Sequence, residues 1–220
     1  MSYNIAIDGP ASAGKSTTAK LLAKRLDYIY VETGSMYRAI SVYLCEQNIQ
    51  YNCEADVIKE LDKIFIDIKY KDGVQHIFVN EQDVTDKLRR EEIGEIASII
   101  APIPEVREKL LNLQRTLAKS NDVIMDGRDI GSVVLPDADL KIYLDADIST
   151  RAQRRHEELI EKGMTKTLDE VREDIKQRDY RDMTRETSPL IKADDAVVID
   201  DTNLTKDEVL DKIVSLIKKH

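Results

Sequence analysis

The chain has 220 residues, of which 42% are hydrophobic and 34% are charged. These values are typical of a globular protein, and no window reaches the run of about 18 apolar residues that a membrane-spanning helix needs. A formal net charge of −9 argues against general binding to nucleic acids or anionic membranes. We therefore expect one globular α/β protein, with any phosphate ligand held by locally concentrated cations.

The N-terminal segment lacks the basic and apolar stretches of a secretory signal, which favours a cytoplasmic protein. The two cysteines, Cys45 and Cys53, have no partner residues for a zinc site, and cytoplasmic thiols are kept reduced. We interpret both as free thiols. The sequence has no obvious stripe for self-association, so we expect a monomer.

The N-terminal part predicts a βαβ unit. A strand is expected over residues 4–8, followed by a glycine-rich turn and a helix over 16–26. A second strand over 28–31 and a second helix over 35–47 follow, and both helices carry apolar residues at helical spacing. Strand, glycine loop, helix and strand in this order imply a parallel sheet.

The middle of the chain has a different pattern. Residues 64–70 and 74–79 alternate apolar and polar positions around Lys71-Asp72-Gly73, which indicates a hairpin with one solvated face. We interpret this hairpin as an insertion outside the parallel sheet. Helical spacing resumes over 93–100, is interrupted by two prolines, and continues over 106–117.

The last third predicts three more strands, at 123–125, 140–144 and 196–199. The stretch 148–185 is helical but poor in apolar residues, so we expect shallow packing and mobility there. A threonine followed three residues later by glutamate predicts two helix starts, Thr167 with Glu170 and Thr205 with Glu208.

The most specific single motif is a glycine-rich loop between a predicted strand and a predicted helix. It fits the spacing Gly, four residues, Gly-Lys-Ser/Thr. Glycines let backbone N–H groups turn toward phosphate oxygens, and the following helix presents its positive end. Lys15 is expected to reach the β and γ phosphates of ATP, and Ser16 to ligate Mg²⁺. The predicted ATP-binding residues of the loop are Gly9, Pro10, Ala11, Ser12, Ala13, Gly14, Lys15, Ser16 and Thr17.

A phosphate loop alone does not distinguish switch GTPases, ATPase motors and small-molecule kinases. The chain lacks the Asn-Lys-x-Asp element that reads guanine, which disfavours a GTPase. The strand that ends at Asp126 runs into Gly127-Arg128-Asp129 instead of the acidic pair of motor ATPases, and Arg128 indicates a second anion beside the first. We expect Asp126 to hold Mg²⁺ through water, with Asp8 as a weaker candidate.

Arginines are concentrated late in the chain, where eight of the 14 lie between positions 128 and 185. No histidine lies next to a candidate nucleophile, and a dianionic phosphate acceptor needs no general base. These features favour transfer to an acceptor that is itself a phosphate. We expect six arginines to repel one another when no anion is bound: Arg151, Arg154, Arg155, Arg178, Arg181 and Arg185.

Taken in order, five segments resemble bacterial cytidylate kinases: Ile7 to Pro10, Glu32 to Arg38, Asp126 to Gly131, Arg151 to Arg155, and Arg178 to Arg185. The resemblance covers nearly the whole chain. It implies a P-loop kinase fold, in which a parallel sheet is flanked by helices. Residues 1–36, 105–150 and 189–220 would form the core, 37–104 a nucleoside-monophosphate-binding region with the hairpin insertion, and 151–188 a mobile helical lid.

The resemblance also implies a reaction, in which ATP with Mg²⁺ phosphorylates CMP or dCMP. The acceptor phosphate would be held by Arg38, Arg128 and Arg185, and Thr33 would lie near it. Cytosine would be read by Ser98, Arg107 and Asp129, and the sugar would lie near Arg178 and Asp182. The lid residues over ATP would be Arg151, Arg154 and Arg155. The main catalytic groups would be Lys15, Arg128, Arg155 and Arg185. Met183 stands where relatives can carry a further lid arginine.

The implied base contacts have a physical reason. Cytosine exposes an amino donor where uracil has an acceptor, so an ionised Asp129 accepts from the first and repels the second. Arg107 can donate to the acceptor side of the ring. A buried polar group left unpaired costs about 1–3 kcal/mol, which would separate the two bases.

Two other functions remain open at this point. One is a kinase of the same fold with another acceptor, such as UMP, AMP or shikimate. The other is a non-catalytic or RNA-associated module that binds ATP without transferring its phosphoryl group, which the acidic charge and the clustered arginines disfavour. Simpler interpretations of single residues are an ion pair between Asp129 and Arg128 and a helix-surface hydroxyl for Ser98.

Overall fold

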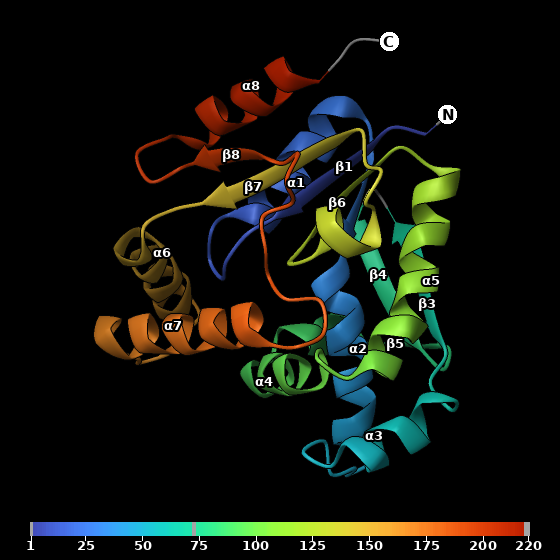
Figure 1. Ribbon diagram of the computed structural model, residues 1–220. Coiled ribbons are helices and arrows are strands. Elements are labelled where there is room, and N and C mark those ends of the chain that lie inside the picture. The colour runs from blue at the N-terminus through green and yellow to red at the C-terminus, as the bar shows by residue number, and fades with distance from the viewer. Residues whose placement is uncertain (1, 72–73, 218–220) are drawn as a thin grey trace.

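The computed structural model describes residues 2–71 and 74–217. Its core is a five-stranded sheet in the order β2-β6-β1-β7-β8, and every pairing within it is parallel (Figure 1). This confirms the predicted parallel sheet. The strands are β1 (Asn4–Asp8), β2 (Ile29–Glu32), β6 (Val123–Gly127), β7 (Leu140–Asp145) and β8 (Val197–Asp200).

Helices cover both faces of this sheet, because alternate residues of its strands point to opposite sides. Ile5 and Ile7 of β1 pack with α1 (Lys15–Leu26) and α8 (Lys206–Leu216). Ala6 belongs to the other core, with residues of two longer helices, α2 (Thr33–Glu46) and α5 (Pro104–Ser120). The near-continuous apolar strands of the sequence reflect this burial on both faces.

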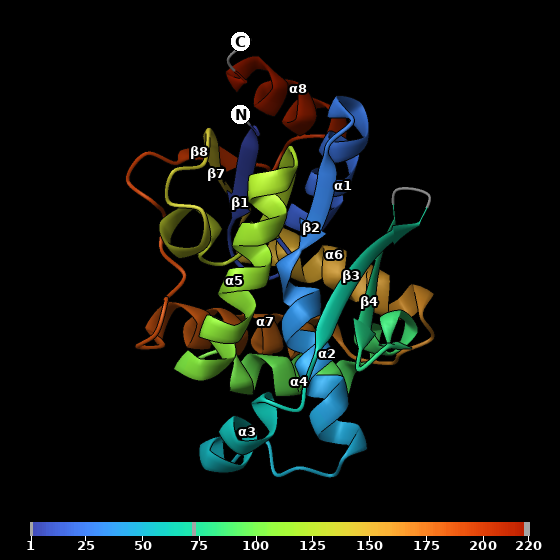
Figure 2. The ribbon, with the colours of Figure 1, turned by 90° about the vertical axis from the view of Figure 1, so that its right-hand side faces the viewer.

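The predicted hairpin is present as a separate antiparallel sheet beside β2 and α2 (Figure 2). It contains β3 (Ile66–Lys71), β4 (Val74–Val79) and the short β5 (Gln82–Asp83). The predicted turn at Asp72 and Gly73 lies outside the described residues. The Tyr70 hydroxyl donates to the Tyr30 carbonyl at 3.2 Å, which fastens the hairpin to β2.

Six further elements of the described chain complete the fold, of which α3 (Glu54–Leu61) packs against α5, away from the main sheet (Figure 1). Two short elements were not predicted, since neither has the length for a periodic signal: α3 and the 3-10 helix η1 (Thr85–Arg89). A π-helical turn, η2 (Ile130–Val134), follows β6 and was also not predicted. The other helices are α4 (Glu91–Ile100), α6 (Ile148–Glu161) and α7 (Leu168–Thr184).

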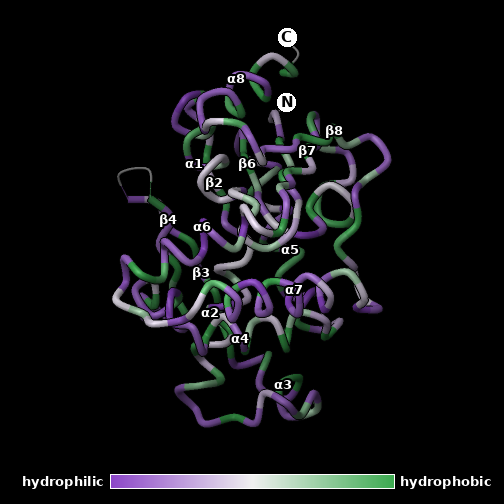
Figure 3. The backbone as a smooth tube through the Cα atoms, turned by 90° about the vertical axis from the view of Figure 1, so that its left-hand side faces the viewer, coloured by the Kyte–Doolittle hydropathy of each residue, from purple (hydrophilic) through white to green (hydrophobic). Residues whose placement is uncertain are grey.

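Helices α6 and α7 pack more closely than their composition predicts. Hydrophilic residues run along both in the hydropathy-coloured trace (Figure 3). The few apolar residues nevertheless form a small buried cluster, in which Ala152 and Leu159 of α6 meet Val171 and Ile175 of α7. The expectation of shallow packing is therefore wrong for this cluster. Both predicted capping boxes are confirmed, at the starts of α7 and α8.

Two further expectations can be compared with the structure. Cys45 and Cys53 are free and partly exposed, which agrees with their interpretation as unpaired thiols. Within residues 2–71 and 74–217, none of the helices combines the length and the apolar character that crossing a membrane requires.

Neighbouring leucines of α1 provide a matched test of the core. Leu22 is fully buried against β1 and α8, whereas Leu21 is 38% exposed. Leu22→Ala is expected to lower the free energy of unfolding by about 2–5 kcal/mol, because it removes buried methyl groups and leaves a cavity. Leu21→Ala should cost less than about 1 kcal/mol. Urea unfolding of both variants checks this, and equal losses would contradict the described packing.

Candidate functional site

The phosphate loop connects β1 to α1, and left-handed backbone shapes it. Gly9, Ser12 and Gly14 have positive φ angles of 150°, 60° and 78°. The Lys15 side chain is 5% exposed, and its Nζ donates to the Pro10 carbonyl at 2.6 Å. Burial and the nearby Arg128 hold the pKa of Lys15 well below its usual value. The loop thus surrounds the buried ammonium group of Lys15. Burial makes this positive charge costly, so an anion bound beside it would be favourable.

Arg151 and Asp179 bind the backbone of this loop at Ala11. The Ala11 N–H donates to Asp179 Oδ1 at 2.8 Å, and Arg151 Nη1 donates to the Ala11 carbonyl at 2.9 Å. Arg151 also pairs with Asp179 Oδ2 at 2.5 Å. Arg151 is 8% exposed and does not line the cavities described below, so its placement does not support the predicted position over ATP. Asp179 was missed, because an acidic residue in a polar helix gives no signal of its own.

Ser16 and Asp126 meet at the start of α1. Ser16 Oγ donates to Asp126 Oδ2 at 2.7 Å, and the Tyr30 hydroxyl donates to Asp126 Oδ1 at 2.8 Å. Burial raises the pKa of Asp126, and the charge of Glu32 raises it further. A hydroxyl and a carboxylate are oxygen ligands of the kind that Mg²⁺ prefers, together with water and phosphate.

The described side chains alone do not supply a complete set of metal ligands. Among the described residues, no three or more His, Cys, Asp or Glu side chains form a group that could hold a metal ion. Ser16 and Asp126 therefore fit a cation that arrives with a nucleotide and keeps phosphate and water ligands. Asp8, the weaker candidate, accepts one backbone N–H at each carboxylate oxygen and lines neither cavity, so its placement does not support this role.

Most of the predicted site residues line one cavity of about 1190 Å³, which extends from the phosphate loop past the end of β6 to α4. Residues far apart in the sequence meet there because their segments converge on the carboxyl edge of the sheet. The predicted residues that line it are Ser12, Ala13, Gly14, Lys15, Ser16, Thr17, Thr33, Arg38, Ser98, Arg107, Asp126, Arg128, Asp129, Arg154, Arg155, Arg178, Asp182 and Arg185.

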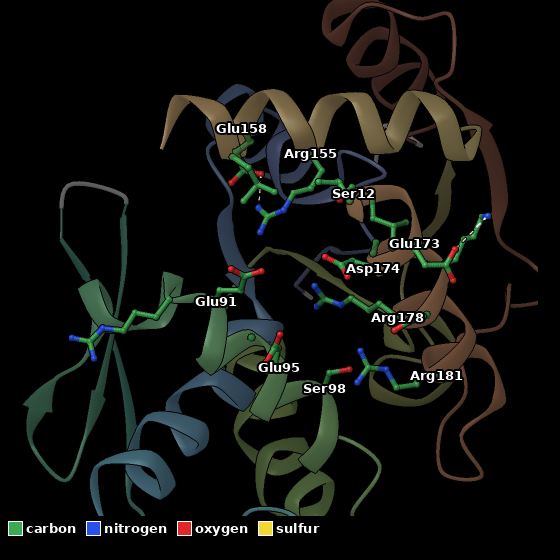
Figure 4. A pocket seen from close by; sticks show the side chains of 18 of the residues that line it. Ser12, Glu91, Glu95, Ser98, Arg155, Glu158, Glu173, Asp174, Arg178 and Arg181 are labelled. Carbon is green, nitrogen blue, oxygen red and sulfur yellow. Dashed lines mark hydrogen bonds and ion pairs between the residues drawn. The ribbon is translucent and has the colours of Figure 1, made fainter. Parts of the chain in front are cut away.

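A second cavity, of about 910 Å³, adjoins the first and shares several of its residues. Figure 4 shows Arg155 of α6 and Arg178 of α7 reaching into it, with Glu91 and Ser98 on the opposite wall formed by α4. Lys166, in the connection between α6 and α7, pairs with Glu91. The two helices and α4 thus enclose a space beside the phosphate loop.

Three guanidinium groups, those of Arg38, Arg128 and Arg185, line the main cavity together with Lys15. Arg128 Nε donates to Asp182 Oδ2 at 2.7 Å, and Arg185 Nη1 lies 3.9 Å from Asp182 Oδ1. Arg38 Nη1 donates to the Leu88 carbonyl at 2.9 Å. Arg185 Nη2 is buried and, within the described part of the chain, has no hydrogen-bond acceptor. Unmet donors of this kind favour an anionic ligand.

Asp129, Arg107 and Ser98 form the far end of the cavity. Arg107 Nη2 donates to Asp129 Oδ2, and Arg185 Nη2 lies 3.7 Å from Asp129 Oδ1. Asp129 is thus paired with these two arginines and not, as the simpler interpretation had it, with Arg128. Ser98 Oγ is buried without a hydrogen-bond partner among the described residues. An unpaired buried hydroxyl is costly, so a polar ligand that forms a hydrogen bond with Ser98 would be favourable here.

Carboxylates offset most of the charge that was expected to cause repulsion. Arg154 pairs with Asp201 at 2.9 Å and Arg155 with Glu158 at 2.8 Å, in addition to the pairs of Arg151 and Arg185 described above. The expected mutual repulsion is therefore reduced for these four arginines. Arg178 differs: burial, and then Arg128, lowers its pKa to about 10, and its Nε finds no acceptor in the described chain.

Other residues of the site had escaped the sequence analysis. Glu32, at the end of β2, accepts two hydrogen bonds from Arg89, at 2.9 and 2.6 Å, and lines the main cavity. Tyr30 holds Asp126 as described above. Sequence position could have identified Glu32, because an acidic residue at the end of a buried strand in a parallel sheet lies at the carboxyl edge, where the site is. The contacts of Tyr30 and Arg89 depend on packing and have no such signal.

A lysine-containing phosphate loop that shares one cavity with clustered arginines, at the carboxyl edge of a parallel sheet, defines a P-loop phosphotransferase. The family model described as cytidylate kinase matches residues 5–219. The chain is 52% identical to the cytidylate kinase of Caldicellulosiruptor saccharolyticus, over 98% of this chain and 96% of that one. It is 49% identical to that of Lactobacillus johnsonii, over 98% and 94%. The protein belongs to the cytidylate kinase family, as the order of its motifs indicated.

Solved structures share the fold at low sequence identity. An uncharacterized protein from Eubacterium ventriosum matches with a TM-score of 0.54 and 14% identity, over 99% of both chains. A gluconokinase from Sinorhizobium meliloti matches with a TM-score of 0.50 and 11% identity, over 97% of this chain and 90% of that one. These likenesses support the P-loop kinase fold alone.

Two glycines near the site provide a matched test of the loop geometry. A Cβ on Gly9 would lie 2.0 Å from the Leu144 carbonyl oxygen, whereas a Cβ on Gly34 would meet no atom within 4 Å. Gly9→Ala is expected to lower the free energy of unfolding by at least about 3 kcal/mol. The new methyl group would overlap the Leu144 carbonyl oxygen, and relieving the overlap would require a backbone segment to move. Gly34→Ala, within α2, should preserve or slightly raise it. Urea unfolding checks both, and a stable Gly9→Ala protein would be inconsistent with this loop.

Proposed function

We propose that this protein transfers the γ-phosphoryl group of ATP to CMP or dCMP, giving ADP and CDP or dCDP. The observation that carries the proposal is the set of Asp129, Arg107 and Ser98 in the same cavity as the phosphate loop. Together they offer a carboxylate acceptor, a guanidinium donor and an unpaired hydroxyl to a base that has both donors and acceptors. Membership of the cytidylate kinase family supports the same acceptor.

In this proposal the two ends of the cavity hold the two nucleotides. ATP phosphates bind the backbone N–H groups of the loop and Lys15, with Arg154 and Arg155 beside them. The acceptor phosphate binds Arg38, Arg128 and Arg185 near Thr33, and the acceptor sugar lies near Arg178 and Asp182. Guanidinium forks suit this task, because they match phosphate oxygens in pairs.

We also propose that Mg²⁺ arrives with ATP, held by Ser16 and, through water, by Asp126. Bound there, the ion would neutralise charge on the β and γ phosphates. The acceptor needs no general base, because its second pKa is about 6 and it is mostly dianionic at pH 7. The work of the chain is to position two anions and to keep water away from the γ phosphate.

The proposed division of the chain follows from these roles. Residues 1–36, 105–150 and 189–220 form the catalytic core, 37–104 bind the monophosphate, and 151–188 form a lid that closes over ATP. We propose that the enzyme acts as a monomer in the cytoplasm, where both nucleotides are available, without a stable nucleic-acid or membrane partner.

Arg128→Lys tests the acceptor-phosphate site. Lysine keeps the charge but loses the fork, so kcat/KM for CMP is expected to fall at least about 100-fold, or about 2.7 kcal/mol of transition-state stabilisation. Circular dichroism should be unchanged. Arg25→Lys is the matched control, because Arg25 pairs with Asp211 on exposed surfaces of α1 and α8. Near wild-type turnover by Arg128→Lys would remove Arg128 from the site.

A panel of acceptors tests the function itself. ADP release is measured by a coupled assay with CMP, dCMP, UMP, AMP and shikimate, and CMP or dCMP is expected to give the highest kcat/KM. Asp129→Asn should lower the CMP-to-UMP ratio about 10-fold or more, because an uncharged amide discriminates less between an amino donor and a carbonyl acceptor. A preference for another acceptor, or ATP binding without ADP release, would refute the proposal.

A further inference from the structure

Asp8 makes a contact that phosphoryl transfer does not require. It ends β1, is 5% exposed, and directs both carboxylate oxygens at successive backbone N–H groups. Ile130 donates to Oδ1 at 2.8 Å, and Gly131 donates to Oδ2 at 2.7 Å. Asp8 lines neither of the two cavities described above, so its carboxylate serves the backbone of residues 130 and 131.

The two N–H groups belong to the start of η2, which follows Arg128 and Asp129 directly. Asp129 is the N-cap residue of η2, but its side chain makes no capping hydrogen bond. An aspartate at this position ordinarily accepts from the N–H groups of the first turn. Here Asp8, at the end of β1, supplies the carboxylate that accepts these N–H groups. The Asp129 side chain pairs with Arg107 and Arg185 instead.

We propose that Asp8 is a positioning residue for acceptor selectivity: by capping η2 from β1, it leaves the Asp129 carboxylate available to the base. This inference depends on the proposed function of Asp129. Asp8 does not touch the acceptor itself. It acts on Asp129 through the backbone of residues 130 and 131, which fixes where the Asp129 side chain leaves the chain.

The packing around this contact supports the role. A Cβ on Gly131 would lie 3.4 Å from Asp8 Oδ2 and 3.1 Å from the Lys141 side chain, so both side chains pack closely against the backbone of Gly131. Parallel pairing of β1 with β6 puts Asp8 opposite Gly127, one residue before Arg128. Burial raises the pKa of Asp8 to about 6, so at neutral pH the carboxylate is mostly ionised and offers both oxygens as acceptors.

Asp8→Asn is the direct test. Asparagine has nearly the same shape, but it turns one acceptor into an N–H₂ donor that faces a backbone N–H. The ratio of kcat/KM for CMP to that for UMP is expected to fall about 10-fold, and KM for CMP to rise, while KM for ATP changes less than about 2-fold. A merely structural role would reduce activity with both acceptors alike. An unchanged ratio in the folded variant would overturn the inference.

Asp139→Asn is the matched control. Asp139 Oδ2 accepts the backbone N–H of Asn4, at the opposite end of β1, at 2.7 Å. This variant also removes a carboxylate that binds a strand N–H, but it lies far from Asp129. Its CMP-to-UMP ratio should equal that of the wild type. A fall equal to that of Asp8→Asn would indicate a general effect on β1 and would overturn the inference.

A double-mutant cycle shows whether Asp8 acts through Asp129. In an Asp129→Asn background, adding Asp8→Asn should not lower the ratio further, because the group that it positions is already altered. A further independent fall would refute the mechanism. If Asp8→Asn does not fold, amide exchange in the wild type carries the test: protected Ile130 and Gly131 amides support the contact, and rapidly exchanging ones refute it.

Failure of this inference is distinguishable from failure of the proposed function. A wild-type enzyme that does not prefer CMP or dCMP would refute the proposed function. A wild-type enzyme with that preference, retained in folded Asp8→Asn, would refute only the role of Asp8.

Discussion

The parallel register between β1 and β6 is the constraint on which the site depends. It pairs Ile7 with Asp126 and Asp8 with Gly127, so the two strands end at the same level. The phosphate loop leaves one strand and the Arg128-Asp129 turn leaves the other. Because both turns emerge at the same edge, residues of the phosphate loop and Arg128 line one cavity.

Charge compensation by carboxylates is the second feature that organises the site. Asp179 forms an ion pair with Arg151 next to the phosphate loop, and Asp182 forms one with Arg128 in the main cavity. Removing a guanidinium from water is costly unless it is paired, so each carboxylate lets an arginine remain partly buried and ordered. Burial and the charge of Arg128 lower the pKa of Arg178 to about 10, and its Nε has no hydrogen-bond acceptor among the described residues, so an anion beside it would be favourable. Anion binding is thus favoured at a few prepared positions, whereas most of the positive charge is already neutralised.

Particular elements explain which expectations were met. The strand at 4–8 follows from a short apolar run that ends at a glycine-rich turn, and it is buried on both faces. The helix that carries Met36, Ile40 and Leu44 follows from periodicity, because one buried face repeats along it. The π-helical turn after Asp129 has no such repeat. Its conformation depends on a carboxylate 122 residues earlier in the chain, and no local pattern records that contact. The small core between α6 and α7 was likewise missed, since a few apolar residues of the two helices form it together with Ala11 of the phosphate loop.

By itself the sequence determined the parallel α/β core, the phosphate loop and the family, because these depend on local spacing and on motifs whose chemistry is carried by adjacent residues. It also indicated most of the side chains that line the cavity. Only the tertiary structure decided their partners: that Arg151 supports the loop from behind, that Asp129 pairs with Arg107 and Arg185, and that Asp8 caps η2. Hydrogen bonds between strands and helices far apart in the chain are set by three-dimensional packing, which residue order alone does not specify.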